Sequence, residues 1–203
     1  LFGEGFKWDG IETAGRLDPG IFAEAAALNG LGDSHEHHQR FHDHYIEQLE
    51  RELDVSRDRI EVMPGIHDAL QSLRHRADTR GDIVLGLLTG NYTRAVPLKL
   101  KSIGGAPAWF AITSFRDEGP TRPDLVAVAL RKYEQRFHEP ADRTRVIVIG
   151  DTPHDVTCAK AHDCIAFAVA TGHFSMEQLV DAGADVVARD LSDLSPLLQL
   201  IGE

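Results

Sequence analysis

The chain has 203 residues, of which 42% are hydrophobic and 26% are charged. This length and composition suit one globular domain, or a core domain that carries a smaller insertion. With 21 basic and 32 acidic side chains the net charge is −11, which argues against nucleic acid or an anionic membrane as a general partner.

Cysteine content and hydropathy point to the cytoplasm. Cys158 and Cys164 are too few for a disulfide framework and lack the spacing of a zinc site. No apolar run reaches the roughly 18 to 20 residues that cross a bilayer. The first residues, LFGEGFKWDG, lack the basic start and the apolar stretch of a signal peptide. We therefore predict a cytoplasmic protein without a membrane partner.

The first 60 residues have a helical pattern and no evident strand. The stretch DPGIFAEAAALNG begins with Asp-Pro and ends with Gly, as helices often do. A longer helix is predicted from about Ser34 to Leu53, where Asp33 and Glu36 have the spacing of a capping box and apolar residues follow a helical period. We predict an all-helical subdomain over residues 1–60.

From residue 61 on, short apolar runs alternate with helical stretches. The runs are continuous rather than alternating, which is typical of strands that are covered on both faces. Strands are predicted within 82–90, 109–115, 145–151, 164–172 and 184–188, and helices near 65–76, 92–103, 122–137, 154–162 and 175–182. The pattern predicts an α/β fold over residues 61–203, with a doubly wound, Rossmann-like parallel sheet.

Two predicted strands end in polar residues, at the edge where such sheets bind ligands. LGLLTGN delivers Thr89, Gly90 and Asn91, whose hydroxyl and backbone N–H groups suit a phosphate, although a plain turn uses the same residues. VIVIGD delivers Asp151, and Asp155 follows four residues later. These two carboxylates suit Mg²⁺, although a helix cap and a solvated first-turn acid would look the same.

The combination of these motifs resembles the haloacid-dehalogenase-like (HAD) superfamily of phosphohydrolases, in particular its phosphoglycolate-phosphatase-like members with a helical cap. The segments AGRLDPGIF, VMPGIHDAL and VATGHFSMEQLVDAGADVV add to the likeness, which spans essentially the whole chain. The resemblance implies that residues 1–60 form the cap and that Thr89 is the second motif. It also implies that Asp151 binds Mg²⁺ and that Asp155 supports the site.

Two features depart from the family pattern. The third motif usually supplies a lysine, but here the candidate is Arg122 in GPTRPDL. Its permanent positive charge can bind phosphate oxygens or a carboxylate. The alternative interpretation is that Arg122 is an exposed residue before a helix. We interpret Lys99 and Lys132 as surface helix lysines. The family's first strand ends in Asp-x-Asp, and no such motif occurs in the chain; Asp9 follows no apolar strand.

In the resemblance, the Asp-x-Asp strand is central and lies between the strands predicted at 83–88 and 146–149. Its removal would leave these neighbours roughly 9.6 Å apart with unpaired backbone groups. We therefore expect this strand, with the nucleophile, in a segment before residue 1.

The helical subdomain offers weaker candidates. Arg16 and Asp18 could reach from the cap into the cleft. His38 and His42 have the i, i+4 spacing of a metal pair, but no third ligand is evident, and a partly buried cap helix explains them more simply.

The resemblance implies an Mg²⁺-dependent hydrolase that acts on a small, phosphoglycolate-like phosphomonoester through an aspartyl phosphate. Asp151 would bind the metal. The catalytic residues would be Thr89, Arg122 and Asp155, and the residues in contact with substrate would be Thr89, Gly90, Asn91, Arg122 and Arg16. Two alternatives stay open: a HAD-fold binding protein without a nucleophile, and a 2-haloacid dehalogenase, which needs no metal.

Overall fold

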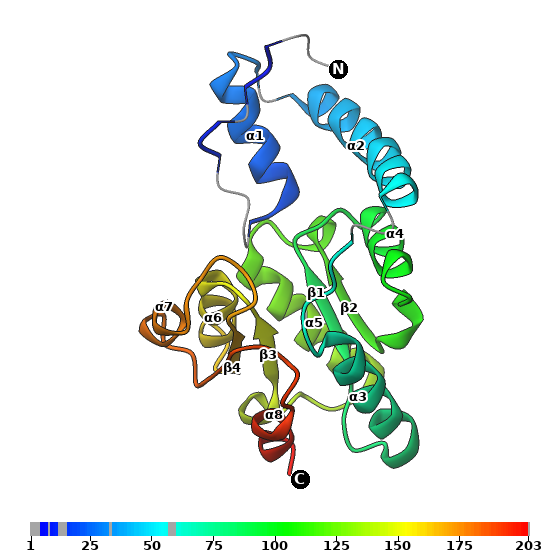
Figure 1. Cartoon of the computed structure of the whole chain (residues 1–203), viewed down its shortest axis with the longest axis vertical. Helices are drawn as coiled ribbons and strands as arrows, with labels where there is room; N and C mark the ends of the chain where they lie inside the picture. Colours follow the sequence, from blue (N-terminus) through cyan, green and yellow to red (C-terminus); the bar gives the residue numbers. More distant parts are fainter. Residues whose placement is uncertain (1–4, 8, 12–15, 33, 57–59, 203) are drawn as a thin grey trace.

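Helices and strands alternate along most of the chain in the computed structural model, which describes residues 5–7, 9–11, 16–32, 34–56 and 60–202 (Figure 1). The helices are α1 (Asp18–Leu28), α2 (His35–Val55), α3 (Ile66–Arg80), α4 (Ala95–Ser102), α5 (Arg122–Phe137), α6 (Pro153–Lys160), α7 (Met176–Asp181) and α8 (Ser195–Leu200). The strands are β1 (Gly86–Thr89), β2 (Ile112–Phe115), β3 (Ile147–Gly150), β4 (Ile165–Val169) and β5 (Val186–Ala188).

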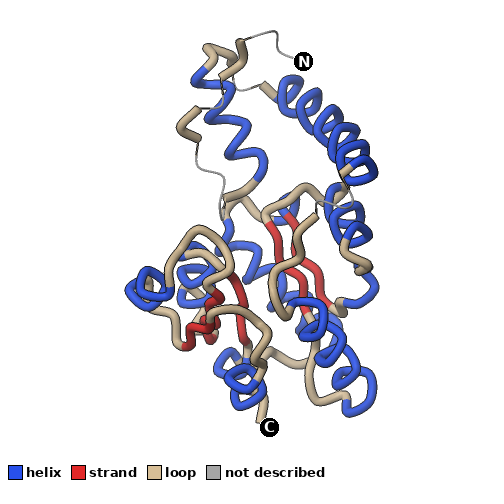
Figure 2. The backbone as a smooth tube through the Cα atoms, in the orientation of Figure 1, coloured by secondary structure: helices blue, strands red, loops and turns tan. Residues whose placement is uncertain are grey.

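The strands form two parallel sheets, which Figure 2 shows as separate groups of strands. In the smaller sheet β1 pairs with β2, and Thr89 lies opposite Phe115. In the larger sheet the order is β3-β4-β5, and Gly150 lies opposite Ala168. The predicted α/β class with parallel strands is confirmed. The single sheet that the apolar runs suggested is instead divided, because no ladder joins β1 to β3 in the described part of the chain.

Strand β4 shows why the core has two sides. Successive side chains of a strand point to opposite faces. Ala166 and Ala168 accordingly join an apolar cluster with residues of α5, α6 and α7, whereas Phe167 and Val169 join a second cluster with residues of α3 and α8. Helices therefore cover both faces of the larger sheet, as a doubly wound fold requires.

The N-terminal helices α1 and α2 lie at one end of the molecule, and the C-terminal helix α8 lies at the other (Figure 1). Helix α2 begins after Ser34, whose hydroxyl accepts a hydrogen bond from the His37 N–H at 3.2 Å. Asp33, expected in a capping box, lies outside the described residues. Ile46 of α2 packs against Tyr92 and Ala95 and so attaches α2 to α4.

Short 3-10 helices precede β2 and β3, and another follows β2. The 3-10 helices are η2 (Pro107–Trp109), η3 (Arg116–Glu118) and η4 (Arg143–Arg145). Near the C terminus, α8 begins with Ser195 and Pro196. Within the described residues, every helix is too short or too polar to cross a membrane.

Candidate active site

The turn after β1, residues 89–92, contains the first group of candidate residues. Its Asn91 N–H donates to Oγ1 of Thr89 at 3.2 Å. The Thr89 hydroxyl therefore acts as an acceptor within the turn and retains its proton to donate to a ligand. A Cβ on Gly90 would lie 2.7 Å from the carbonyl oxygen of Arg16 and 3.3 Å from Nη1 of Arg122. The absence of a side chain at Gly90 thus lets three distant segments meet.

The turn after β3 leads directly into α6, and a capping box organises it. Oδ2 of Asp155 accepts hydrogen bonds from the Thr152 N–H at 3.1 Å and from the Thr152 hydroxyl at 2.8 Å. Asp155 is buried, at 7% exposure, so it is not the solvated first-turn acid that the sequence also allowed. A Cβ on Gly150 would lie 2.2 Å from Cγ of Asp155, so this glycine leaves room for the buried carboxylate.

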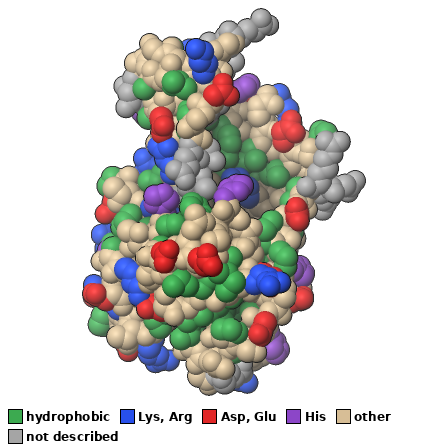
Figure 3. All heavy atoms as spheres, turned by 60° about the vertical axis from the view of Figure 1, so that its left-hand side comes forward, with side chains coloured by type: hydrophobic (Ala, Val, Ile, Leu, Met, Phe, Trp, Pro, Cys, Tyr) green, Lys and Arg blue, Asp and Glu red, His purple; other side chains and the backbone are tan. Residues whose placement is uncertain are grey.

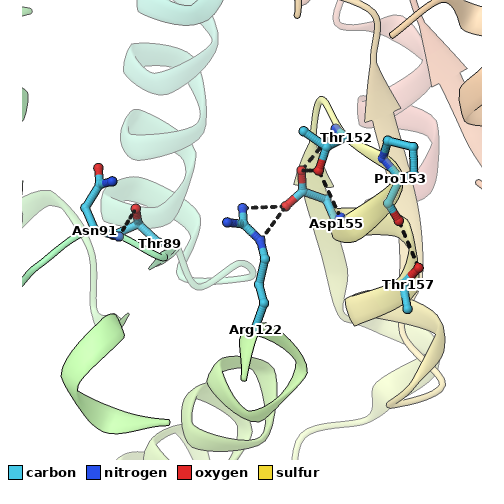
Figure 4. A network of polar contacts seen from close by, with 7 residues as sticks. All are labelled: Thr89, Asn91, Arg122, Thr152, Pro153, Asp155 and Thr157. Carbon is cyan, nitrogen blue, oxygen red and sulfur yellow. Dashed lines mark hydrogen bonds and ion pairs between the residues drawn. The ribbon is translucent and has the colours of Figure 1, made fainter. Parts of the chain in front are cut away.

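Arg122, at the start of α5, lies between these two turns (Figure 4). Its Nε and Nη2 donate to Oδ1 of Asp155 at 3.2 and 2.7 Å. Because its Nη1 lies beside Gly90, the guanidinium connects the end of β1 to the end of β3. Arg122 is thus a partly buried, charge-paired side chain and not an exposed residue before a helix.

Asp151, the first residue after β3, is held in a crowded and partly buried place. Burial and the neighbouring Asp155 raise the pKa of its carboxyl group, and Arg122 opposes this shift only in part. A Cβ on Gly172, in the loop after β4, would lie 2.3 Å from Oδ2 of Asp151. The carboxylate of Asp151 therefore lies against the backbone of Gly172, partly buried and next to a second carboxylate.

Asp151 can supply one of the oxygen ligands that Mg²⁺ requires. Among the described residues, no group of three His, Cys, Asp or Glu side chains could hold a metal ion. Both oxygens of Asp155 are already occupied, by Arg122 and by Thr152. Mg²⁺, however, is often bound through one or two carboxylates, with waters and phosphate oxygens as the remaining ligands. Asp151 alone fits that pattern, with the other ligands supplied from outside these residues.

Asn91 is bound on both sides by charged residues. Its Oδ1 accepts a hydrogen bond from Nζ of Lys99 at 2.9 Å, and its Nδ2 donates to Oδ1 of Asp18 at 3.2 Å. Burial lowers the pKa of Lys99, and Asp18 opposes this shift. The interpretation of Lys99 as a surface lysine is therefore wrong. Lys132 is also directed inward, where it donates to the carbonyl of Thr113 and pairs with Glu118.

The remaining candidates from the helical segment take structural positions. The side chain of Arg16 pairs with Glu24, and its carbonyl oxygen lies beside Gly90. The His38 ring packs edge-on against Phe22, and the His42 ring packs edge-on against Tyr92. On the face shown in Figure 3, basic and histidine side chains gather around a hollow between the upper and lower parts of the molecule.

Comparison with known proteins decides the family. The family model for haloacid dehalogenase-like hydrolase matches residues 1–160. The chain belongs to this family. Its membership confirms the resemblance and the hydrolase class that the motifs predicted. A search of curated proteins finds no match to the HAD-like chain.

Solved structures agree with the HAD-like fold. A hydrolase from Pseudomonas syringae is 21% identical, with a TM-score of 0.69 over 94% of this chain and 81% of that one. CbbY from Rhodobacter sphaeroides, in complex with phosphate, is 18% identical, with a TM-score of 0.58 over 81% and 68%. A predicted phosphoglycolate phosphatase from Haemophilus somnus 129pt is 15% identical, with a TM-score of 0.62 over 95% and 80%. At these identities the likeness establishes the fold.

Sequence reasoning missed Lys99 and Gly172. Lys99 lies on a short helix, and nothing in its neighbours distinguishes it from a solvated lysine. Gly172 follows β4 in VATGHFS and ends the apolar run predicted at 164–172, and a glycine at the end of a predicted strand is the signal that could have marked a close approach of another group.

Proposed function

We propose that this HAD-like hydrolase cleaves a small phosphomonoester, with a phosphoglycolate-like compound as the first substrate to test. The observation that carries the proposal is the position of Arg122, whose guanidinium is fixed by Asp155 and lies beside the turn that follows Thr89. A fixed cation between two strand ends suits a phosphoryl group, whose negative charge must be stabilised before and during transfer.

The three elements around Arg122 have complementary roles in this proposal. The Thr89 hydroxyl, which accepts from the Asn91 N–H, would donate to one phosphoryl oxygen, and the backbone N–H of Gly90 would donate to another. Nη1 of Arg122, which Asp155 does not use, offsets the charge of the phosphoryl group. Asp155 keeps the guanidinium in one orientation, so that little reorganisation is needed during the reaction.

Asp151 would hold Mg²⁺ in this proposal. The ion, when bound, would neutralise phosphoryl oxygens and lower the cost of bringing an anionic nucleophile close to them. The partial burial of Asp151 beside Asp155 supports this role, because a cation would stabilise a carboxylate that has lost part of its hydration.

The nucleophile implied by the family resemblance is an aspartate in an Asp-x-Asp motif. No such motif occurs in residues 1–203, and we assign it to a strand outside them that lies between β1 and β3. The carboxylate would attack phosphorus and displace the alkoxide leaving group, which takes a proton from an acid. Water would then hydrolyse the acyl phosphate and release phosphate.

We assign residues 1–60 the role of a cap that covers the leaving group. Helices α1 and α2 lie at the end of the molecule toward which the turn after β1 faces, and the backbone of Arg16 contacts that turn directly (Figure 1). A cover at this place would exclude water from the reacting centre and select the leaving group.

The test is phosphate release from p-nitrophenyl phosphate and from phosphoglycolate by the natural protein, with and without Mg²⁺. Asp151→Asn should lower turnover by at least about 100-fold and abolish the response to Mg²⁺. Arg122→Ala should also lose most of the turnover. The exposed Asp181 on α7 provides a matched control, and Asp181→Asn should leave the rate unchanged.

The other outcomes separate the alternatives. Full turnover by Asp151→Asn would refute the metal assignment. Chloride release from 2-chloropropionate in EDTA would favour a dehalogenase. Absence of turnover on every substrate, together with tight binding of phosphate, would favour a binding protein.

A further inference from the structure

Asp18 is the first residue of α1, yet it does little for its own helix. An acidic side chain at this place usually accepts from first-turn N–H groups or interacts with the helix dipole. No side chain caps α1, and the N–H groups of Gly20 and Ile21 donate instead to the carbonyl of Leu17. The carboxylate of Asp18 is directed at the turn after β1, more than 70 residues away in the sequence.

Three hydrogen bonds join Asp18 to successive residues of that turn. Its N–H donates to the carbonyl of Gly90 at 3.1 Å, its Oδ1 accepts from Nδ2 of Asn91 at 3.2 Å, and its Oδ2 accepts from the Tyr92 N–H at 3.0 Å. Every polar group of Asp18 except its carbonyl is thus engaged with residues 90–92. A single residue of the N-terminal helices therefore fixes the backbone that directly follows Thr89.

Lys99 completes the arrangement from the opposite side. Its Nζ donates to the Asn91 oxygen, while Asp18 accepts from the Asn91 nitrogen. The reverse orientation of the amide would place NH₂ against an ammonium group and oxygen against a carboxylate, both repulsive. The two opposite charges therefore allow one orientation of Asn91. The backbone N–H of Asn91 donates to Oγ1 of Thr89, so anchoring of Asn91 also helps to hold the Thr89 hydroxyl.

We propose that Asp18 is a positioning residue for the reaction: with Lys99 it holds the turn at residues 89–92 in the shape that receives the phosphoryl group. The inference rests on the proposed function and adds that docking of α1 and formation of the phosphate site are one event. When α1 moves away, the turn loses its three hydrogen bonds, and Thr89 and Gly90 lose their fixed geometry. Substrate would thus meet a complete site only beneath a docked helix.

A second contact between the N-terminal helices and the core provides the matched control. Asp43 of α2 pairs with Arg94 at 2.9 Å, and both side chains are about half exposed. This pair joins the same two parts of the molecule without touching Thr89, Gly90 or Asn91. If Asp18 acted only by attaching helices, loss of the Asp43 pair should have comparable effects.

The experiment compares Asp18→Asn, Lys99→Met and Asp43→Asn in the natural protein. The measurements are hydrogen exchange of the Tyr92 amide, the dissociation constant of inorganic phosphate, kcat and KM for p-nitrophenyl phosphate, and Tm. Asp18→Asn should speed exchange and weaken phosphate binding by about tenfold or more, with a lower kcat. Lys99→Met should weaken phosphate binding and lower kcat. Asp43→Asn should keep phosphate affinity and kcat within about twofold of the parent values.

Other results would overturn the positioning role. A lower Tm for Asp18→Asn with unchanged phosphate affinity and kcat would reduce the residue to a stability contact. Equal losses in Asp43→Asn would assign the effect to attachment of the helices. If the parent protein neither binds nor hydrolyses phosphate esters, the proposed function fails. Hydrogen exchange of the Tyr92 amide then still tests whether Asp18 holds the turn: faster exchange in Asp18→Asn supports this contact, and unchanged exchange refutes it.

Discussion

Gly172 limits where the carboxylate of Asp151 can lie. A Cβ at residue 172 would come within 2.3 Å of Oδ2 of Asp151, a distance that real Cβ contacts do not show. The side chain of Asp151 cannot remain in place if residue 172 has a methyl group, because Oδ2 of Asp151 is the atom nearest to that methyl group. The position of the proposed metal ligand is thus set by a glycine on a neighbouring strand connection.

Gly172→Ala should therefore damage the site far more than it damages the fold. We expect the Mg²⁺ concentration for half-maximal activity to rise by about tenfold or more, because the ligand is displaced. The measurement is a Mg²⁺ titration of phosphate release, with Tm recorded on the same samples.

Gly20→Ala is the control for that substitution. Gly20 lies in α1, its φ is not positive, and no atom lies within 4 Å of its added Cβ. The change should leave Mg²⁺ dependence unaltered and stabilise the helix slightly. An unaltered Mg²⁺ titration in Gly172→Ala as well would show that Asp151 does not bind the ion from this position.

At the scale of single residues, the sequence predicted positions better than contacts. Asp151 and Thr89 could be placed at the same edge of the core from the sequence, because Asp151 directly follows β3 and Thr89 ends β1. Lys99 could not be found in the same way, since its partner Asn91 and its position against the turn depend on how α4 packs. Arg16 was a candidate for its charge, and the structure directs that charge to Glu24 instead.

Among the helices, α2 is attached to the core by aromatic packing around Tyr92. The Tyr92 ring lies 4.6 Å from the His42 ring in an edge-on contact and 6.0 Å from the Tyr45 ring. The side chain is 6% exposed, and its hydroxyl has no hydrogen-bond partner among the described residues. Burial raises the pKa of Tyr92, which therefore stays neutral over the physiological range.

Tyr92→Phe should be neutral or stabilising by up to about 1 kcal/mol, because it removes a buried hydroxyl that no protein group satisfies and keeps the ring. Tyr92→Ala should cost roughly 3–5 kcal/mol, because it removes the ring as well. Thermal unfolding of both variants measures the difference. Tyr133→Phe on the outside of α5 should change little. Destabilisation of Tyr92→Phe by more than about 1 kcal/mol would mean that the hydroxyl has a partner after all.

The elements themselves were largely predictable. All five strands lie within the apolar runs, because β-branched runs bounded by turn residues suit strands that are covered on both faces. The helix that begins at Arg122 was predicted over the same range as α5, where Pro follows at the second helical position. Helix α8 was missed because SPLLQL is too short to show a helical period.

For the whole molecule, the order of the strands indicates where a further strand would fit in the core. The two sheets run in the orders β2-β1 and β3-β4-β5, all parallel. One further strand between β1 and β3, counted as the first, would give the order 3-2-1-4-5-6 of a doubly wound dinucleotide-binding-type sheet. Leu88 of β1 and Val148 of β3 already contact the same apolar cluster. Ile149 of β3, the edge strand of the larger sheet that would face the added strand, is 40% exposed.

This arrangement was only partly predictable from the sequence. The apolar runs determine which segments become strands, but they contain no information on which strand lies beside which. The chain contains no Asp-x-Asp motif, and no ladder joins β1 to β3 among the described residues; both observations support the proposal of a further strand. The two observations are independent, because one concerns residue identity and the other concerns backbone pairing.

The last prediction concerns the edges of β1 and β3. If a strand from outside residues 1–203 pairs with both, amides of these two strands in the natural protein should exchange slowly, with protection close to that of global unfolding. A chain of residues 1–203 alone should lose this protection by about 100-fold or more, because its edge amides face solvent. Strand β4 is the internal control, since it pairs with β3 and β5 on its two sides and should keep its protection in both chains. Equal protection of β1 and β3 in the two chains would show that no such strand exists, and the nucleophile would then have to come from elsewhere.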